Sequence, residues 1–344
     1  MSQDSAAQNK RGHPDAPARL VVVGASAGGV RALQALASAL PQDFPAAVLV
    51  VLHIGSHPSS LPALLSHCGP LRATHAADGE PIAAGQIHVA PPDHHLLVDA
   101  GRMRLSRGPK EHHSRPAIDP LFRSAALARG PDVVGVVLTG RLDDGTAGLQ
   151  AIKQCGGIAV VQDPADADEP SMPASAVRYV QVDHCVPLAS LAGLLTSLAR
   201  ADVAPAAAPA SPTPAHEHAL SLSLGDPMEH MRAIATPSPF TCPDCHGGLW
   251  EIDGAQPKRY RCHTGHAYTL RTLQHAQGES SDTAMWGALR ALQEQEFLLR
   301  TVLAQLRAEG DHAGNARVEA RMRETAQQAD LLRGLLEQMP EPYE

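Results

Sequence analysis

The sequence predicts a doubly wound α/β domain with a mostly parallel, Rossmann-like sheet, followed by a small cysteine-containing module and a helical hairpin. Two observations support the α/β domain. Short, wholly apolar segments recur through the first 200 residues, and amphipathic helical stretches separate them. Strands that are apolar on both faces are typical of parallel sheets that helices cover on both sides. A change of composition after residue 200 supports the two further parts.

The expected strands and helices alternate along the chain. The apolar segments that predict strands are residues 20–23, 46–52, 87–90, 133–138, 158–161 and 180–182. The stretches with helical periodicity are residues 30–40, 117–129, 146–155 and 188–199. A polar turn between 96–98 and 103–105 predicts a β-hairpin. We therefore expect a flexible tail at 1–18 and one α/β domain at 19–200.

Three further segments follow the α/β domain. Residues 201–235 are rich in Ala and Pro without an amphipathic period, and they predict a semi-extended linker. Clustered cysteines predict a small module at 236–275. Residues 282–340 carry Leu and Met at spacings of three and four, with a Gly-flanked break near residue 310. This pattern predicts a helical hairpin, and a four-helix homodimer is one way to bury its apolar stripe.

The composition excludes several classes of protein. The net charge of the 344-residue chain is −8 and its 28 Lys and Arg residues form no dense run, which argues against nucleic-acid binding. No apolar run approaches the roughly 18–20 residues that span a bilayer. The first 19 residues lack the apolar core of a signal peptide. We therefore expect a cytoplasmic protein without membrane insertion.

A candidate nucleophile follows the first expected strand. Residues 24–28 have the sequence Gly-Ala-Ser-Ala-Gly and lie between a strand and a helix, which is the setting of a nucleophile turn. The following helix would direct its positive end toward negative charge that develops near Ser26. Two alternatives are a plain strand-to-helix turn and a degenerate dinucleotide fingerprint. A dinucleotide site needs an acidic residue at the end of the second strand, where this chain has His53.

Three polar residue types follow the ends of expected strands. Ser26 and His53 end the first two strands, and Asp143 and Asp144 follow the strand at 133–138. Because the carboxyl ends of parallel strands converge on one crevice, these side chains can form a Ser-His-Asp triad. The histidine would deprotonate the serine, and the carboxylate would orient the imidazole. Chemistry alone does not separate Asp143 from Asp144, and both also suit a helix cap.

Several segments occur in the order of one known family. They are the turn at 23–29, the strand that ends at His53, and residues 114–122, 138–145, 171–173 and 182–188. Together they cover about residues 18–200 and resemble the catalytic domain of the bacterial chemotaxis protein-glutamate methylesterases, the CheB type. The resemblance implies that Ser26 is the nucleophile and His53 the general base. It also implies that Asp144, which directly precedes a glycine, is the triad acid.

The resemblance implies an activity and two further site residues. The activity is hydrolysis of glutamyl methyl esters on a methylated chemoreceptor, with deamidation of glutamine through the same acyl-enzyme and no organic cofactor. The backbone N–H of Arg141 matches an oxyanion donor, although the family often has Met-Gly at Arg141 and Leu142. Arg115 lies in the family's active-site rim, and a loop arginine paired with a surface acid is the alternative for it.

One departure from the family affects regulation. These methylesterases usually carry an N-terminal receiver domain, whereas about 18 residues precede the first expected strand in this chain. We therefore expect no phosphorylation control in cis. The alternative function is a regulatory docking module of a chemosensory system, with a vestigial esterase site and a methyltransferase or sensor kinase as partner.

The cysteine-containing module carries a second candidate site. Cys242 and Cys245 form a C-x2-C pair, Cys262 follows after sixteen residues, and His266 lies four residues further on. Three thiolates and one imidazole suit a structural zinc ion without an open position for catalysis. A redox C-x-x-C pair is the alternative, but it has no need of the other two residues. We prefer His266 to His263 as the fourth ligand, because the side chains of adjacent residues such as Cys262 and His263 diverge.

Overall fold

The computed structural model describes residues 19–55, 57–203 and 211–338, which form two compact units divided between Thr272 and Leu273. The tail predicted at 1–18 lies outside the described residues, as do residues 204–210 of the predicted linker and the last two residues of the predicted hairpin.

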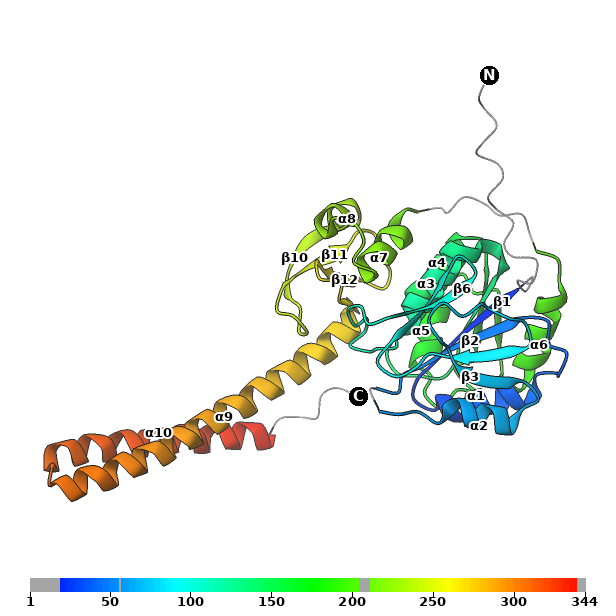
Figure 1. The fold of residues 1–344 in the computed structure, drawn as a ribbon. Coiled ribbons are helices and arrows are strands. Elements are labelled where there is room, and N and C mark those ends of the chain that lie inside the picture. Colours follow the sequence, from blue (N-terminus) through cyan, green and yellow to red (C-terminus); the bar gives the residue numbers. More distant parts are fainter. Residues whose placement is uncertain (1–18, 56, 204–210, 339–344) are drawn as a thin grey trace. The chain divides into compact units, whose positions relative to one another are not determined.

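The first unit contains a seven-stranded sheet in which every neighbouring pair of strands is parallel (Figure 1). Its strand order is β3-β4-β2-β1-β7-β8-β9. The strands are β1 (Leu20–Ala25), β2 (Ala47–Leu52), β3 (Arg72–His75), β4 (Gln86–Val89), β7 (Val133–Val137), β8 (Ile158–Gln162) and β9 (His184–Val186). Because β2 and β7 flank β1 on opposite sides, the crevice beyond the carboxyl ends of these strands is the expected place for a ligand.

Helices cover both faces of this sheet. One face packs on α3 (Ile118–Arg129), α4 (Thr146–Gln154) and α5 (Ser171–Tyr179), and the other on α1 (Gly29–Ala39), α2 (Leu61–Cys68) and α6 (Leu188–Arg200). Alternate residues of β1 serve the two faces: Leu20 and Val22 face the first group, and Val21 and Val23 face the second. The predicted doubly wound α/β fold is therefore confirmed.

The β-hairpin predicted from residues 96–98 and 103–105 is present as β5 (His95–Asp99) and β6 (Arg102–Ser106), which pair antiparallel. The strand predicted at 180–182 is wrong by a few residues, since the edge strand is β9. The reason is local: the N–H of Val180 bonds to the carbonyl of Ala176 at 2.9 Å and ends α5 there.

Two helices lie where the sequence predicted a semi-extended linker. They are α7 (Thr213–Ser221) and α8 (Pro227–Ile234). Their prolines stand in the first helical turn, where a missing N–H costs nothing. Asp226 caps α8 by accepting the N–H of Met228 at 2.8 Å. Pro212, Pro214 and Pro227 thus stand at helix starts.

The cysteine-containing module is a four-stranded antiparallel sheet. Its strands are β10 (Ala235–Thr241), β11 (Gly248–Ile252), β12 (Arg259–Cys262) and β13 (Ala267–Thr269). They belong to the first unit, together with the α/β domain.

The second unit is a helical hairpin made by most of α9 (Leu270–Glu309) and by α10 (His312–Gln338). Helix α9 starts earlier than the predicted residue 282, because it begins at Leu270, directly after the end of β13. Gly310 adopts a φ of 79° between the two helices, which permits the reversal. Within the described ranges, none of the helices combines the length and the hydropathy that crossing a bilayer requires.

Candidate active site

Ser26 lies in a tight turn between β1 and α1. The backbone holds this turn from both sides, because the N–H of Ser26 bonds to the carbonyl of Thr139 at 3.0 Å and its carbonyl accepts the N–H of Gly29 at 2.8 Å. Gly140 makes room for the serine, since a Cβ on it would lie 2.8 Å from the Ser26 Cβ and closer still to the Met172 sulfur. The turn therefore presents the Ser26 hydroxyl at the carboxyl edge of the sheet.

The structure brings Ser26, His53 and Asp144 together. His53 directly follows β2, and its Nδ1 lies 3.1 Å from the Ser26 Oγ. Its Nε2 lies 2.8 Å from the Asp144 Oδ2. With the carboxylate accepting from Nε2–H, the Nδ1 atom of His53 is free to accept the serine proton. The three side chains form a continuous hydrogen-bonded chain of the kind that activates a serine.

Asp144 is held as an anion at the N-terminus of α3. Its carboxylate accepts the N–H groups of Ile118 at 2.7 Å and Asp119 at 3.0 Å. Burial alone would raise the pKa of Asp144, but the charge of His112 and the hydrogen bond from His53 lower it to about 2. A carboxylate that stays ionised can stabilise the imidazolium that forms at His53.

The two adjacent aspartates have different surroundings. Asp143 is buried and accepts a hydrogen bond of 2.7 Å from the Thr269 hydroxyl, whereas Asp144 contacts the histidine. Burial raises the pKa of Asp143, although His112 and Thr269 act in the opposite direction. The geometry therefore separates two residues that chemistry alone left equivalent.

A second histidine, His112, contacts the triad acid from the other side. Its Nε2 lies 2.8 Å from the Asp119 Oδ2 and 3.5 Å from the Asp144 Oδ1. Burial would lower the pKa of His112, but the charge of Asp144 and the hydrogen bond with Asp119 raise it to about 10. This residue was not predicted from the sequence. The available signal was its position just before the segment 114–122 that resembles the family.

A cavity of about 420 Å³ opens beside the triad. Ser26 and His53 line it, together with Arg31 and Asp168, which form an ion pair at its rim. Neither of these two residues was predicted from the sequence. Their position suits contacts with the part of a substrate that extends from the reacting group.

Arg115 and Arg141 do not line this cavity. The Arg115 guanidinium pairs with Asp93 at 2.6 Å and donates to the carbonyl of Gly108 at 2.8 Å. This is the arrangement of a loop arginine paired with an acid. The Arg141 side chain pairs with Glu169 at 3.2 Å, and the next residue, Leu142, has a φ of 63°. The turn is therefore tight at the position where the family often has glycine.

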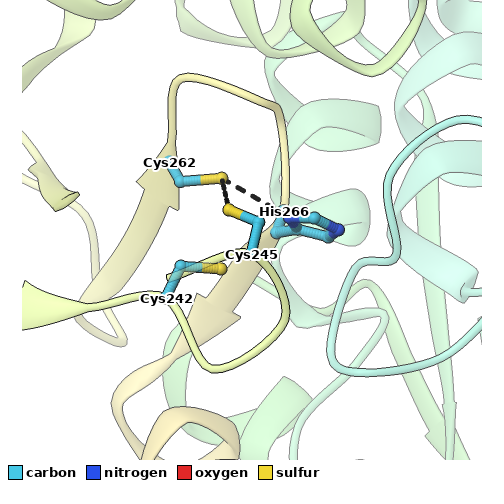
Figure 2. A group of neighbouring side chains, drawn as sticks. All are labelled: Cys242, Cys245, Cys262 and His266. Atoms are coloured by element: carbon cyan, nitrogen blue, oxygen red, sulfur yellow. Dashed lines mark hydrogen bonds between the residues drawn. The ribbon is translucent and has the colours of Figure 1, made fainter. Parts of the chain in front are cut away.

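The four predicted metal ligands lie together in the module, with their side chains pointing toward one another (Figure 2). One ligand atom from each of Cys242, Cys245, Cys262 and His266 falls within 4.8 Å of all the others. The Cys245 and Cys262 sulfurs are 3.7 Å apart, and the Cys262 sulfur is 3.5 Å from the His266 Nδ1. Tetrahedral zinc with bonds of about 2.3 Å places two sulfurs about 3.8 Å apart. The residues present therefore fit a zinc ion.

Comparisons with known proteins identify the family of the α/β domain. Residues 21–195 match the family model described as CheB methylesterase. A putative protein-glutamate methylesterase/protein-glutamine glutaminase of Leptospira interrogans is 37% identical over 180 residues, which are 52% of this chain and 93% of the relative. Protein-glutamate methylesterase/protein-glutamine glutaminase 2 of Anaeromyxobacter dehalogenans is 40% identical over 191 residues, which are 54% of this chain and 56% of the relative.

A solved structure of the same family also matches this chain. The Thermotoga maritima CheB methylesterase catalytic domain is 31% identical and aligns with a TM-score of 0.51, over 52% of this chain and 98% of that one. The resemblance noted in the sequence is thus confirmed, and the chain belongs to the CheB methylesterase family.

Proposed function

We propose that this protein is a protein-glutamate methylesterase, a serine hydrolase that removes methyl groups from glutamyl methyl esters of a chemoreceptor-like protein. The observation that carries the proposal is the hydrogen-bonded chain from Ser26 through His53 to Asp144, which opens on a cavity. The names of the relatives support the same substrate class. An intact triad favours this function over a docking module with a vestigial site.

The geometry supports an acyl-enzyme mechanism. His53 Nδ1 takes the proton of Ser26 as the serine oxygen attacks the ester carbonyl. The positive end of α1 and the backbone N–H of Arg141 stabilise the oxyanion, and Asp144 stabilises the imidazolium. The intermediate collapses, and methanol leaves with the proton from His53. Water then attacks the acyl-enzyme and gives a proton to His53, which returns it to the departing Ser26 oxygen as the glutamyl carboxylate is released. A glutamine side chain follows the same path with ammonia as leaving group.

We propose that the module holds a structural zinc ion through Cys242, Cys245, Cys262 and His266. Four protein ligands leave no position for a substrate, so the ion would stabilise the fold of the module and would not contact the reacting groups. The unpaired cysteines of the described chain suit a reducing compartment, and we place the protein in the cytoplasm.

We further propose that the helical hairpin forms a homodimer. Several large apolar side chains on it are exposed, namely Trp286, Phe297, Leu298, Leu331 and Leu335. A second hairpin would bury this apolar surface in a four-helix arrangement. The partner expected at the catalytic site is a methylated receptor, whereas a methyltransferase or sensor kinase of the same signalling system would dock on the module and the helices.

Methanol release from a methylated chemoreceptor fragment tests the proposed activity. Wild type should release methanol and Ser26→Ala should not. Ser38→Ala makes the same change on the exposed side of α1 and should behave as wild type. Full activity of the Ser26→Ala variant would overturn the proposal.

A further inference from the structure

The cysteine-containing module contacts the loop that carries His112. The N–H of His112 donates to the carbonyl of Ala267 at 2.7 Å, and the N–H of Ala267 points to the carbonyl of Lys110 at 3.4 Å. Ala267 directly follows His266, the predicted metal ligand. The position of this loop therefore depends on the strand that leaves the metal site.

A buried charge cluster holds this contact together. The Arg261 guanidinium of β12 is fully buried and pairs with Glu111 at 3.0 Å and with Glu217 at 3.4 Å. Glu111 also pairs with Arg123 of α3 at 2.6 Å, and Glu217 with Arg259 at 2.7 Å. Separating the module from α3 would leave charges unpaired in the interior, which is strongly unfavourable. The module is therefore a fixed part of the first unit.

Two routes lead from this contact to the triad acid. On the first, the Thr269 hydroxyl of β13 donates to Asp143, the neighbour of Asp144 in the chain. On the second, the His112 ring touches Asp119 and Asp144, while its Nδ1 lies 3.4 Å from the Thr272 hydroxyl. Both threonines are buried. The position of the Asp144 carboxylate thus depends on residues of the module.

We propose that the cysteine-containing module is a brace for the triad acid, with Thr269 and His112 as positioning residues, so that metal bound at the four ligands controls the rate of hydrolysis. The inference rests on the proposed function for its link to catalysis, because Asp144 must be the acid that orients His53. Thr269 and His112 act through Asp143 and Asp144 and do not line the cavity beside Ser26.

The Thr269 hydroxyl provides a precise way to test the brace. Thr269→Val keeps the size of the side chain but leaves Asp143 without its donor, whereas Thr269→Ser keeps the hydroxyl. Since a small displacement of a catalytic group costs up to about 100-fold in rate, we expect kcat to fall about 10- to 100-fold in the valine variant. KM should stay unchanged and the serine variant should recover the rate.

Three further variants separate positioning from folding. The Thr269 hydroxyl also accepts the N–H of Thr272 at 3.1 Å and so helps to begin α9. Asp143→Ala removes the same hydrogen bond from the other side and leaves that cap intact. It should lower kcat as Thr269→Val does, and the double variant should lose no more than either single one. Thr236→Val makes the same chemical change on an exposed position of the module and should leave the rate unchanged.

The experiment uses the full chain loaded with zinc and two readouts. One is kcat and KM on p-nitrophenyl acetate, with the hydrolysis rate of the Ser26→Ala variant subtracted as the background. The other is the downfield proton resonance of the His53 ring N–H that faces Asp144, which reports the hydrogen bond without any turnover. Thr269→Val and removal of zinc by a chelator should both shift this resonance, and added zinc should restore it.

The outcomes separate the two proposals. If Thr269→Val matches Thr236→Val in both the resonance and kcat, the brace is overturned. If chelation leaves the resonance in place, the metal dependence is overturned. If wild type shows no hydrolysis above the Ser26→Ala background while the resonance responds to Thr269→Val, the proposed function fails and the brace stands.

Discussion

The α/β domain and the cysteine-containing module, which share one compact unit, are stabilised by different forces. The sheet of the α/β domain packs between two clusters of 27 buried apolar residues each, counted among the described residues. Among the described residues, one apolar cluster of five residues joins the module to α7 and α8, and the module also contains a buried arginine and the four predicted metal ligands. Burial of hydrocarbon is enough to specify the first region. The second has buried paired charges and, as we propose, a bound metal, which small modules commonly need.

Removal of the metal tests this difference with the largest expected effect. Structural zinc contributes on the order of 10–16 kcal/mol of apparent binding free energy to small modules. Cys262→Ser should therefore unfold residues 235–269 and leave the sheet of the α/β domain folded. Hydrogen exchange would show lost protection in β11 and β12 and unchanged protection in β1 and β7. Cys68→Ser, at an exposed cysteine of the α/β domain, is the control, and retained protection of the module in Cys262→Ser would contradict a structural metal.

Substitution of Ser26 or His53 should affect chemistry more than stability, because the buried charges around Asp144 stay in place. Ser26→Ala and His53→Ala should each lower kcat by about 10⁴-fold, and the double variant should lose little more, because the triad acts as a unit. Asp144→Asn should be severe and Asp143→Asn much milder, since an amide oxygen still accepts from Thr269. Ester hydrolysis and thermal unfolding of the same samples provide the measurement. A more severe loss in Asp143→Asn than in Asp144→Asn would reverse the assignment of the acid.

The buried and the exposed ion pairs should differ in their contribution to the free energy of unfolding. Arg261→Met leaves Glu111 and Glu217 without one of their partners in the interior, and it should cost about 3–5 kcal/mol. Arg200→Met breaks the exposed pair with Asp43 and should cost less than about 1 kcal/mol. Urea unfolding of both variants tests the difference. Equal losses would show that the buried cluster does not hold the module in place.

Acid should weaken the buried charge cluster through Glu217. Burial would raise the pKa of Glu217, but Arg259 and Arg261 lower it to about 2. The unfolded chain thus binds the proton at a higher pH than the folded one. The stabilisation is complete above the ordinary pKa of 4.5 and is lost as the pH falls toward 2. It amounts to about 3 kcal/mol at most. Unfolding measured from neutral pH downward should show this slope in wild type, and Glu217→Gln should flatten it.

The smallest effect on chemistry is expected from the helical hairpin. Leu298→Glu places a charge on the exposed apolar surface and should convert a dimer to a monomer, while kcat on a small ester stays within about twofold, because the reacting groups are untouched. Light scattering and ester hydrolysis measure the two effects. Gln293→Glu adds the same charge at an exposed polar position of α9 and is the control. A wild-type monomer would contradict the dimer.

The sequence by itself determined the α/β fold and the place of both sites. Wholly apolar strands separated by amphipathic helices leave few arrangements other than a covered parallel sheet. In such a sheet the strand ends converge, so Ser26, His53 and the aspartates meet without any knowledge of the loops. The metal ligands could also be predicted from the sequence, because a C-x2-C pair followed by a cysteine and a histidine is a local pattern.

The resemblance already implied that Asp144 is the aspartate facing His53, but only the tertiary structure decided what surrounds this pair. His112 touches Asp144 because a loop is held by Ala267, more than a hundred residues away in the chain. The docking of the module through Glu111, Arg123 and Arg261 likewise joins distant segments. Periodicity and spacing report the partners of a residue within its own helix or strand. Contacts between loops depend on how complete elements pack, and for these the sequence pattern carries no signal.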